Sequence, residues 1–401
     1  MKFLKRLFQK KSNGPYELLQ DFLNQYQSKS GTAVNHVTAL RATTALACAR
    51  VIGEGIAQVP LKVYRELPDG GREQVREHPL YDILAIKPND YQTSYDWRET
   101  MGLHLVFAGG AFAFINRVRG DISELLPFEP HDVKVKRTKG VLTYSLRNSE
   151  GGWVQVDATD ILHLRGPSWN GWSGLDGVDL AREAIGLSIA TEEHGAALFK
   201  NGATPGGILT SDAINLQKDQ RDAIKASWED LHKGSGNAHK TAILWGGLKW
   251  LSTAQQNDQA QYLETRGFQV EEVCRAFRVL PTMVGHSDKA ATYASVEQMF
   301  LAHVVHTMGP WYARLEQSFD TQLLSEEDRQ NGYYTKFTVA GLLRGAHKER
   351  SEYYAKALGS GGSPAWMTQD EVRALEDLNP VGGSAEQLPV ASNVGGTVSD
   401  E

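Results

Sequence analysis

The apolar positions of this chain follow a helical period in some stretches and a strand period in others. From about residue 40 to residue 58 an apolar side recurs at helical spacing, and Pro60, which cannot continue a helix, marks its end. Residues 60–165 then form short apolar or alternating runs between Gly, Pro and Asp turns, and we expect strands at 61–64, 111–115, 133–136 and 142–146. One helix interrupts this block at 94–107, with Ser94 as its expected N-cap.

A more helical part follows the Gly- and Trp-rich loop at 166–177. Residues 178–200 carry apolar side chains in several directions, as expected of a helix with more than one neighbour. A small α/β insert comes next, with strands predicted at 207–210, 241–245 and 248–251 and an amphipathic helix at 216–232. Helical spacing returns at 258–277, and Pro281 is expected to stop that helix.

The last part begins with a polar, glycine-containing loop. Beyond it the spacing predicts a helix of about 30 residues with one apolar face, kinked at Gly309-Pro310 because proline lacks an N–H and clashes with the preceding turn. A strand at 333–339 and short helices near 345–358 and 368–378 complete the ordered part, and the stretch after Pro380 has the composition of a flexible tail. Together these patterns predict an α+β fold.

Composition narrows the function classes. With 401 residues, 41% of them hydrophobic, the chain can bury a sizeable core in two or three compact units. No apolar run reaches the roughly 18 residues of a membrane span, and residues 1–11 lack the apolar stretch of a signal peptide, so we expect a cytoplasmic protein. The net charge of −6 leaves no global basic footprint for tight nucleic-acid binding, so any DNA contact should be loose. Cys48 and Cys274 are too few for a disulfide framework or zinc site and should be buried hydrophobes.

Charge is concentrated at the two ends. Lysines and arginines lie beside apolar residues in 1–11, and acidic residues gather between 370 and 401. The plain interpretation is two solvated tails. The alternative is that the amphipathic start docks on a partner or a membrane surface.

A search for catalytic and metal-binding motifs finds no HExxH and no GxxxxGK[ST]. The segment 171–175 resembles a nucleophile elbow but ends in Leu175, where glycine is needed for the sharp turn. His303 and His306 have ligand-like spacing without a third ligand, and His163 lies in an alternating strand where a hydrogen-bonded, half-buried histidine is the expectation. We therefore expect no catalytic, cofactor-binding or metal-binding residues.

A series of short words in a fixed order carries a family resemblance. The words are 44–50 (TALACAR), 56–61 (IAQVPL), 78–84 (HPLYDIL), 160–165 (DILHLR), 198–202 (LFKNG), 205–207 (PGG), 275–279 (RAFRV), 343–345 (LRG) and 371–373 (EVR). Each is weak alone, but in this order the chain resembles the portal proteins of tailed bacteriophages, particularly the long non-contractile-tailed type. Leu280-Pro281 departs from the two prolines of many relatives.

The resemblance implies a layout. After a basic tail at 1–30, residues 31–175 and 293–340 would form the wing, the second part with the long kinked helix. Residues 176–202 and 257–279 would be two stem helices flanking a small α/β clip at 203–256. A tunnel loop at 280–292, a short helical crown at 341–380 and a flexible tail at 381–401 would complete the chain.

The implied function is mechanical. Such subunits form a ring, usually of twelve, at one capsid vertex of the virion, through which double-stranded DNA is packaged by a separate terminase ATPase and later ejected. The implied partners are further copies of the chain, DNA bound without sequence preference, the terminase large subunit, the major capsid protein or a scaffold, and a head–tail adaptor, with no membrane and no cofactor.

Two groups of residues are candidates for these contacts. The loop expected to line the narrowest point comprises Gly285, His286, Ser287, Asp288, Lys289, Ala290, Ala291 and Thr292. His286 and Lys289 are its expected donors to phosphate. Lys218, Lys225 and Asp230 are expected on the exposed clip helix, where charge reversal should disturb motor docking more than ring formation.

The alternatives are another capsid-associated or membrane-docked structural protein, and a nucleic-acid-processing or hydrolytic enzyme. Ring formation without nuclease or ATPase turnover separates the portal class from the enzyme class.

Overall fold

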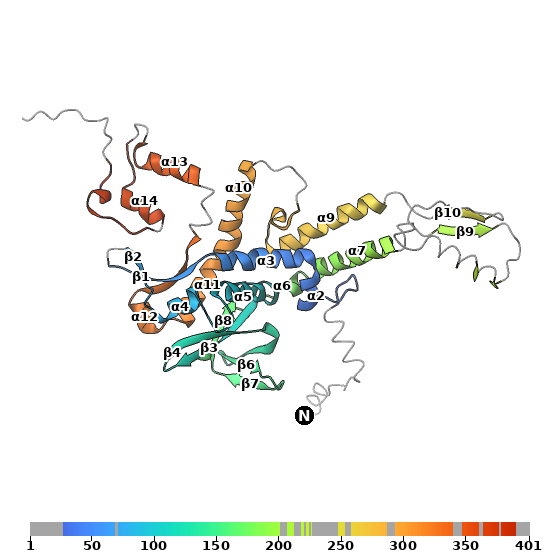
Figure 1. Ribbon diagram of the computed structural model, residues 1–401, viewed down its shortest axis with the longest axis horizontal. Helices are drawn as coiled ribbons and strands as arrows, with labels where there is room; N and C mark the ends of the chain where they lie inside the picture. Colours follow the sequence, from blue (N-terminus) through green and yellow to red (C-terminus); the bar gives the residue numbers. More distant parts are fainter. Residues whose placement is uncertain are drawn as a thin grey trace, which may run out of the picture. The chain divides into compact units, whose positions relative to one another are not determined.

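The computed structural model describes residues 27–68, 71–200, 207–211, 218–219, 222–223, 226, 248–252, 258–286, 293–339, 347–360, 364–376 and 378–389. The chain divides into two compact units. The first unit consists of Met1–Leu46 and Val178–Ala276, and the second of Ala47–Gly177 and Phe277–Glu401. Helices and strands alternate irregularly in both (Figure 1), which makes the fold α+β.

The first unit is mainly helical. Helix α2 (His36–Arg41) begins with a capping box in which the side chains of Asn35 and Thr38 bind each other's backbone N–H. The other elements are α3 (Thr43–Gln58) and α6 (Gly177–Leu180), which both cross the division between the units, α7 (Arg182–Lys200), β9 (Gly207–Ser211), β10 (Leu248–Ser252) and α9 (Asp258–Phe277). Strands β9 and β10 pair antiparallel, with Gly207 opposite Ser252.

In the part of the second unit that the structure describes, the strands form three antiparallel three-stranded sheets, with strand orders β11-β1-β2, β4-β3-β8 and β5-β6-β7. Their bounds are β1 (Leu61–Glu66), β2 (Arg72–Gln74), β3 (Gly110–Val118), β4 (Asp121–Phe128), β5 (Val133–Thr138), β6 (Val141–Arg147), β7 (Trp153–Val156), β8 (Ile161–Arg165) and β11 (Tyr333–Phe337). The alternation read from the sequence thus produces strands in every run where it was predicted between 61 and 146.

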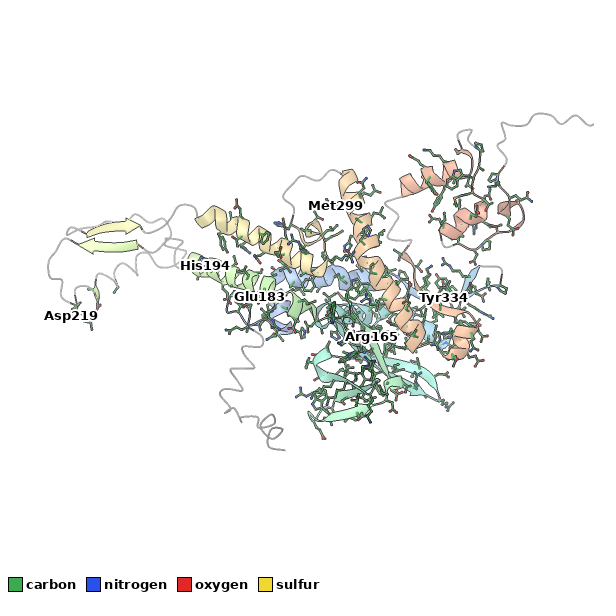
Figure 2. All side chains as sticks on the ribbon, turned by 180° about the vertical axis from the view of Figure 1, so that it is seen from behind. Arg165, Glu183, His194, Asp219, Met299 and Tyr334 are labelled. Atoms are coloured by element: carbon green, nitrogen blue, oxygen red, sulfur yellow. The ribbon has the colours of Figure 1, made fainter. Side chains whose placement is uncertain are left out.

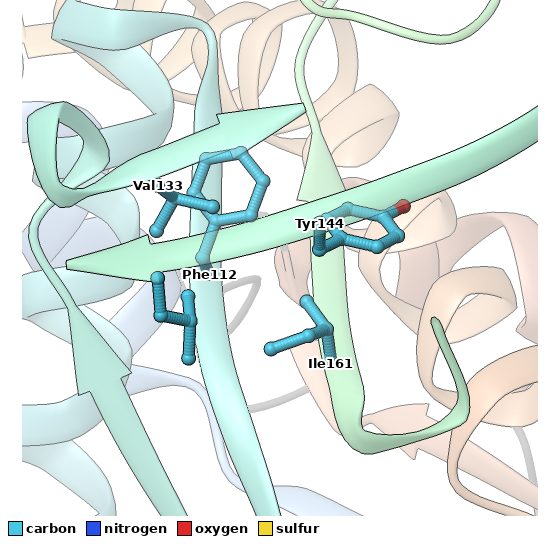
Figure 3. Close-up of a cluster of buried hydrophobic side chains, with 5 residues drawn as sticks. Phe112, Val133, Tyr144 and Ile161 are labelled. Carbon is cyan, nitrogen blue, oxygen red and sulfur yellow. The ribbon is translucent and has the colours of Figure 1, made fainter. Parts of the chain in front are cut away.

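A cluster of buried side chains joins two of these sheets. Phe112 of β3 and Ile161 of β8 pack against Val133, Tyr144 and Leu146 of β5 and β6 (Figure 3). Because successive side chains of a strand point to opposite faces, this burial fixes which face of the β5-β6-β7 sheet is turned inward.

Helices complete the second unit. They are α4 (Pro79–Ala85), α5 (Ser94–Ala108), α10 (Tyr293–Ala302), α11 (Gly309–Gln322), α12 (Glu326–Gln330), α13 (His347–Ala357) and α14 (Gln369–Leu375), with a π-helical segment η5 (His303–Met308) between α10 and α11. The 3₁₀ turns within the described residues are η1 (Pro130–Asp132), η2 (Ala158–Asp160), η4 (Pro281–Val284) and η8 (Gly383–Glu386). Helix α11 is fastened to β11, because the Asp320 carboxylate accepts the Thr335 N–H at 2.7 Å and the Glu316 carboxylate accepts the Phe337 N–H at 2.7 Å.

The turn from α5 into β3 requires glycine. Gly109 has φ +68°, and a Cβ there would lie 2.2 Å from the Leu175 carbonyl oxygen. No L-residue fits that space, so glycine is required here for the 166–177 loop to lie this close to the end of α5.

Several predicted boundaries are wrong by a few residues. Thr93, not Ser94, caps α5, because Thr93 and Asp96 form a capping box. The helix expected at 40–58 starts earlier and breaks at Ala42, whose backbone is extended. Helix α9, by contrast, ends at Phe277 as predicted, and Arg278, in the left-handed conformation that usually terminates a helix, ends it before Pro281 is reached.

The C-terminal order extends beyond the predicted boundary at residue 380. The Asp370 carboxylate accepts the N–H groups of Val381 and Gly382 at 2.8 and 2.9 Å. Ala385 of η8 is buried, so residues 381–389 fold onto the segment that carries α14. Within the described residues, no helix combines the length and the apolar character needed to cross a membrane.

Candidate functional site

The predicted tunnel loop begins with a well-defined turn. Leu280 precedes η4, and the N–H of His286 closes the turn onto the Pro281 carbonyl at 3.0 Å. Gly285 ends it with φ +79°. Of the eight predicted loop residues, Gly285 is exposed and His286 is half-buried. Ser287, Asp288, Lys289, Ala290, Ala291 and Thr292 lie outside the described residues.

The root of this loop, residues 277–281, is tied to the helix that follows it. Arg278 has φ +57°, a conformation that costs a non-glycine residue free energy. Its carbonyl accepts the hydroxyl of the buried Thr307 at 3.0 Å. Phe277 also packs edge-on against Phe107 of α5, with ring centroids 6.1 Å apart. The loop root is therefore anchored within the second unit by one side-chain hydrogen bond and one aromatic contact.

Thr307 itself lies in the π-helical segment η5. The Gly309 N–H bonds to the Val304 carbonyl, five residues back, and Pro310 follows at the start of α11. Proline has no N–H to extend the ladder, and a wider turn accommodates that loss. The structure thus places Pro310 where the hydrogen-bond pattern of the long helix changes, and the kink predicted there stays a prediction.

Buried His303 opens the π-helical segment. Burial lowers the pKa of its imidazole, so it is neutral at physiological pH. His306 is exposed, so the two histidines noted for their spacing do not share a site.

The predicted motor-docking residues fall in the least described part of the chain. Lys218 is helical and exposed, as is its neighbour Asp219 (Figure 2). Lys225 and Asp230 lie outside the described residues. The structure therefore supports an exposed position for Lys218 alone.

Helices α7 and α9 flank this part of the chain in sequence and are in contact with each other. The Tyr262 hydroxyl on α9 donates to the Thr191 carbonyl on α7 at 3.2 Å. The Tyr262 ring lies 6.4 Å from the His194 ring, centroid to centroid, and a Cβ on Gly195 would meet its hydroxyl. Figure 2 shows His194 on α7, next to α9. A glycine opposite a tyrosine lets the two helices approach closely.

A buried arginine holds the end of α3. Arg98 of α5 donates through Nε to the Ser94 carbonyl at 3.1 Å and through Nη1 to the carbonyls of Ile56 and Val59. Burial lowers its pKa to about 10, which leaves it charged at neutral pH. A cation at the C-terminal end of a helix also complements the helix dipole. The Tyr312 hydroxyl binds the Gly55 carbonyl at 2.9 Å, so two side chains bind the last carbonyls of α3.

His163 confirms the expectation of a hydrogen-bonded histidine and is more deeply buried than expected. Its Nδ1 lies 3.1 Å from the Tyr144 hydroxyl, and its ring stacks on Phe112 at 4.5 Å between centroids. The Gln322 side-chain amide accepts the His163 N–H and donates to the His163 carbonyl, at 2.9 and 3.2 Å. Burial lowers the pKa of His163 to about 3, so the imidazole is neutral.

Among the residues that the structure describes, no three His, Cys, Asp or Glu side chains gather as metal ligands would. Cys48 and Cys274 are both buried, as predicted. Arg278 and Thr307 could not be found from the sequence, because their contact joins positions 29 residues apart and neither lies in a recognisable motif.

Comparisons with known proteins cover most of the chain. A family model described as phage portal protein matches residues 43–377. The "Probable portal protein" of Streptomyces phage phiC31 is 30% identical over 381 residues, which cover 91% of this chain and 81% of that protein.

Two solved structures share the fold. A crystal structure of an HK97 family phage portal protein from Corynebacterium diphtheriae matches with a TM-score of 0.56 at 17% identity, covering 78% of this chain and 98% of that one. A chain in the neck of the native gene transfer agent particle, computed with C12 symmetry, matches with a TM-score of 0.60 at 21% identity, covering 86% and 94%. At these identities the likeness shows the fold alone.

Proposed function

The chain belongs to the phage portal protein family, and from that membership we propose that its copies form a ring at one capsid vertex, through which double-stranded DNA is packaged and later ejected. The family match over residues 43–377 carries this proposal. Portal proteins are structural, so the expectation that the chain is not an enzyme is confirmed. The energy for DNA movement would come from a separate terminase ATPase.

The order of elements supports the assignment of parts. Helices α7 and α9 contact each other through Tyr262, and the chain between them contains an antiparallel strand pair. That arrangement suits two stem helices, 176–202 and 257–279, on either side of a clip at 203–256. We assign 31–175 and 293–340 to the wing, 280–292 to the tunnel loop and 341–380 to the crown.

Ring size and bore chemistry follow from the same premise. The C12 symmetry belongs to the neck of the gene transfer agent particle, and it favours twelve subunits here. Twelve copies would carry a formal charge of 12 × −6 = −72. A uniformly acidic bore would repel phosphates evenly, so DNA would slide, with His286 and Lys289 of the tunnel loop as the donors near the narrowest point. Lys218 would belong to the clip surface that docks the terminase. The capsid protein or scaffold and the head–tail adaptor would complete the partners.

Electron microscopy of the purified full chain tests the ring. We expect rings with a central opening by negative stain, a matching large mass by light scattering, and no nuclease or ATPase turnover. A monomer or small oligomer with either activity would contradict the proposal.

A further inference from the structure

One hairpin of the second unit is strongly basic in an otherwise acidic chain. Residues 133–147, which form β5, β6 and their turn, contain five Lys and Arg and no Asp or Glu. They are Lys134, Lys136, Arg137, Lys139 and Arg147, and all five are exposed. The net charge of the chain hides this local excess.

The register of the sheet places three of these cations on one face. Val133, Tyr144 and Leu146 point into the buried cluster (Figure 3), so the alternate positions point outward. On this outward face, Lys134 of β5 lies opposite Ser145 of β6, and Lys136 lies opposite Thr143. The next row pairs Arg147 with Trp153 of β7. We call this outward set, Lys134, Lys136, Thr143, Ser145, Arg147 and Trp153, the basic face.

Trp153 orders part of the basic face. The Lys134 ammonium lies 3.6 Å from the centroid of the Trp153 ring, a cation–π contact that restrains an otherwise flexible side chain. The Arg147 guanidinium lies 3.6 Å from the carboxylate of Asp132, at the edge of the sheet, and half of its side chain stays exposed. The cations are therefore held on a rigid sheet and open to solvent.

We propose that the basic face binds the phosphate backbone of double-stranded DNA at a site separate from the tunnel loop. Two residues apart on one strand, Lys134 and Lys136 are spaced by about 6.6 Å, close to twice the roughly 3.4 Å rise per phosphate of one DNA strand. Thr143 and Ser145 lie on the central strand β6, next to Lys134 and Lys136 of β5. They carry hydroxyl groups of the kind that bind phosphate oxygens. An acidic protein partner fits less well, since lysine is depleted from protein–protein interfaces.

This inference rests on the proposed function for the presence of DNA, and it adds a contact that the tunnel loop does not provide. A closed circular duplex cannot thread a preformed ring, so its binding reports the outer surface. The test is filter binding of a closed circular plasmid to assembled rings over roughly 50 to 200 mM salt. The variant is Lys134→Gln, Lys136→Gln and Arg147→Gln together. The matched control removes three exposed cations elsewhere in the second unit, through Arg50→Gln, Arg76→Gln and Lys87→Gln.

Three phosphate contacts contribute about 2.7 to the slope of log affinity against log salt. Over that salt range the wild type and the control should therefore lose about 40-fold more affinity than the basic-face variant. Equal affinity and slope in variant and wild type would overturn the inference, as would no binding by wild type. If the wild type bound polyglutamate more tightly than the plasmid, and the basic-face variant lost that binding, the DNA inference would be overturned in favour of an acidic protein partner. Microscopy of each sample separates the two proposals. Absence of rings would count against the portal function, whereas the inference about the basic face is judged by DNA binding.

Discussion

Two parts of the second unit differ in how many side-chain hydrogen bonds hold their backbone carbonyls. At the end of α3 the carbonyls of Gly55, Ile56 and Val59 are bound by Tyr312 and Arg98, both buried. At the loop root, the carbonyl of Arg278 is bound by the Thr307 hydroxyl. Polar groups buried away from water must be satisfied, so the first part is a rigid frame, whereas at the loop root one side-chain hydrogen bond, beside the ring contact of Phe277 with Phe107, holds the backbone. A ring that must hold its shape while DNA passes has a use for both.

The frame should show the largest loss of stability. Arg98→Met keeps the length and apolar stem of the side chain but leaves the carbonyls of Ser94, Ile56 and Val59 without this donor, and we expect a loss of about 3 kcal/mol in the free energy of unfolding. Chemical denaturation at matched protein concentration measures it. The exposed Arg76→Met is the control, with an expected change of under about 0.5 kcal/mol. Similar losses in both variants would mean that Arg98 does not hold the frame.

His163 of β8 should make the stability of the second unit sensitive to acid. Its pKa is about 3 in the folded chain, below the ordinary value of 6.5, because burial disfavours the imidazolium. As the pH falls below 6.5, the unfolded chain binds a proton at this histidine and the folded chain does not. The contribution of neutral His163 to the free energy of unfolding is therefore fully present above pH 6.5 and is lost as the pH falls toward 3. The loss is at most about 1.4 kcal/mol per pH unit, or about 2 kcal/mol between pH 6.5 and 5.

Unfolding titrations of the wild type and of His163→Gln at several pH values test this. The stability advantage of the wild type over the variant should shrink by that amount on acidification. The control is His131→Gln, which removes an exposed histidine elsewhere in the second unit. A parallel pH dependence for wild type and His163→Gln would refute the assignment.

The sequence predicted what depends on local pattern. Helix α9 was placed at 258–277, the burial of Cys48 followed from the lack of a disulfide or zinc pattern, and the hydrogen bonding of His163 followed from its place in an alternating strand. Capping chemistry shifted one boundary from Ser94 to Thr93, since either residue can cap and only the folded backbone selects Thr93. Of the predicted loop and clip residues, Gly285, His286 and Lys218 are described, and their assigned contacts stay predictions.

Long-range contacts were beyond the reach of local pattern. Arg98 lies 39 residues from the Val59 carbonyl that it binds, and nothing in its neighbours marks it for burial. The basic face was visible in the sequence, but a net charge of −6 averages it away. The family resemblance came from short sequence motifs in a fixed order. Such motifs carry no information about which side chain binds which carbonyl.

The loop root should show the smallest change in global stability and the most localised one. Thr307→Val keeps the shape of the side chain and removes its hydroxyl, which costs about 1 kcal/mol because the Arg278 carbonyl loses its side-chain donor. Hydrogen exchange should then accelerate at residues 278–286 while exchange at the end of α3 is unchanged. Thr307→Ser, which keeps the donor, is the control. Equal acceleration in both parts would show that the loop root and the frame open together, so that one hydrogen bond does not set the mobility of the loop.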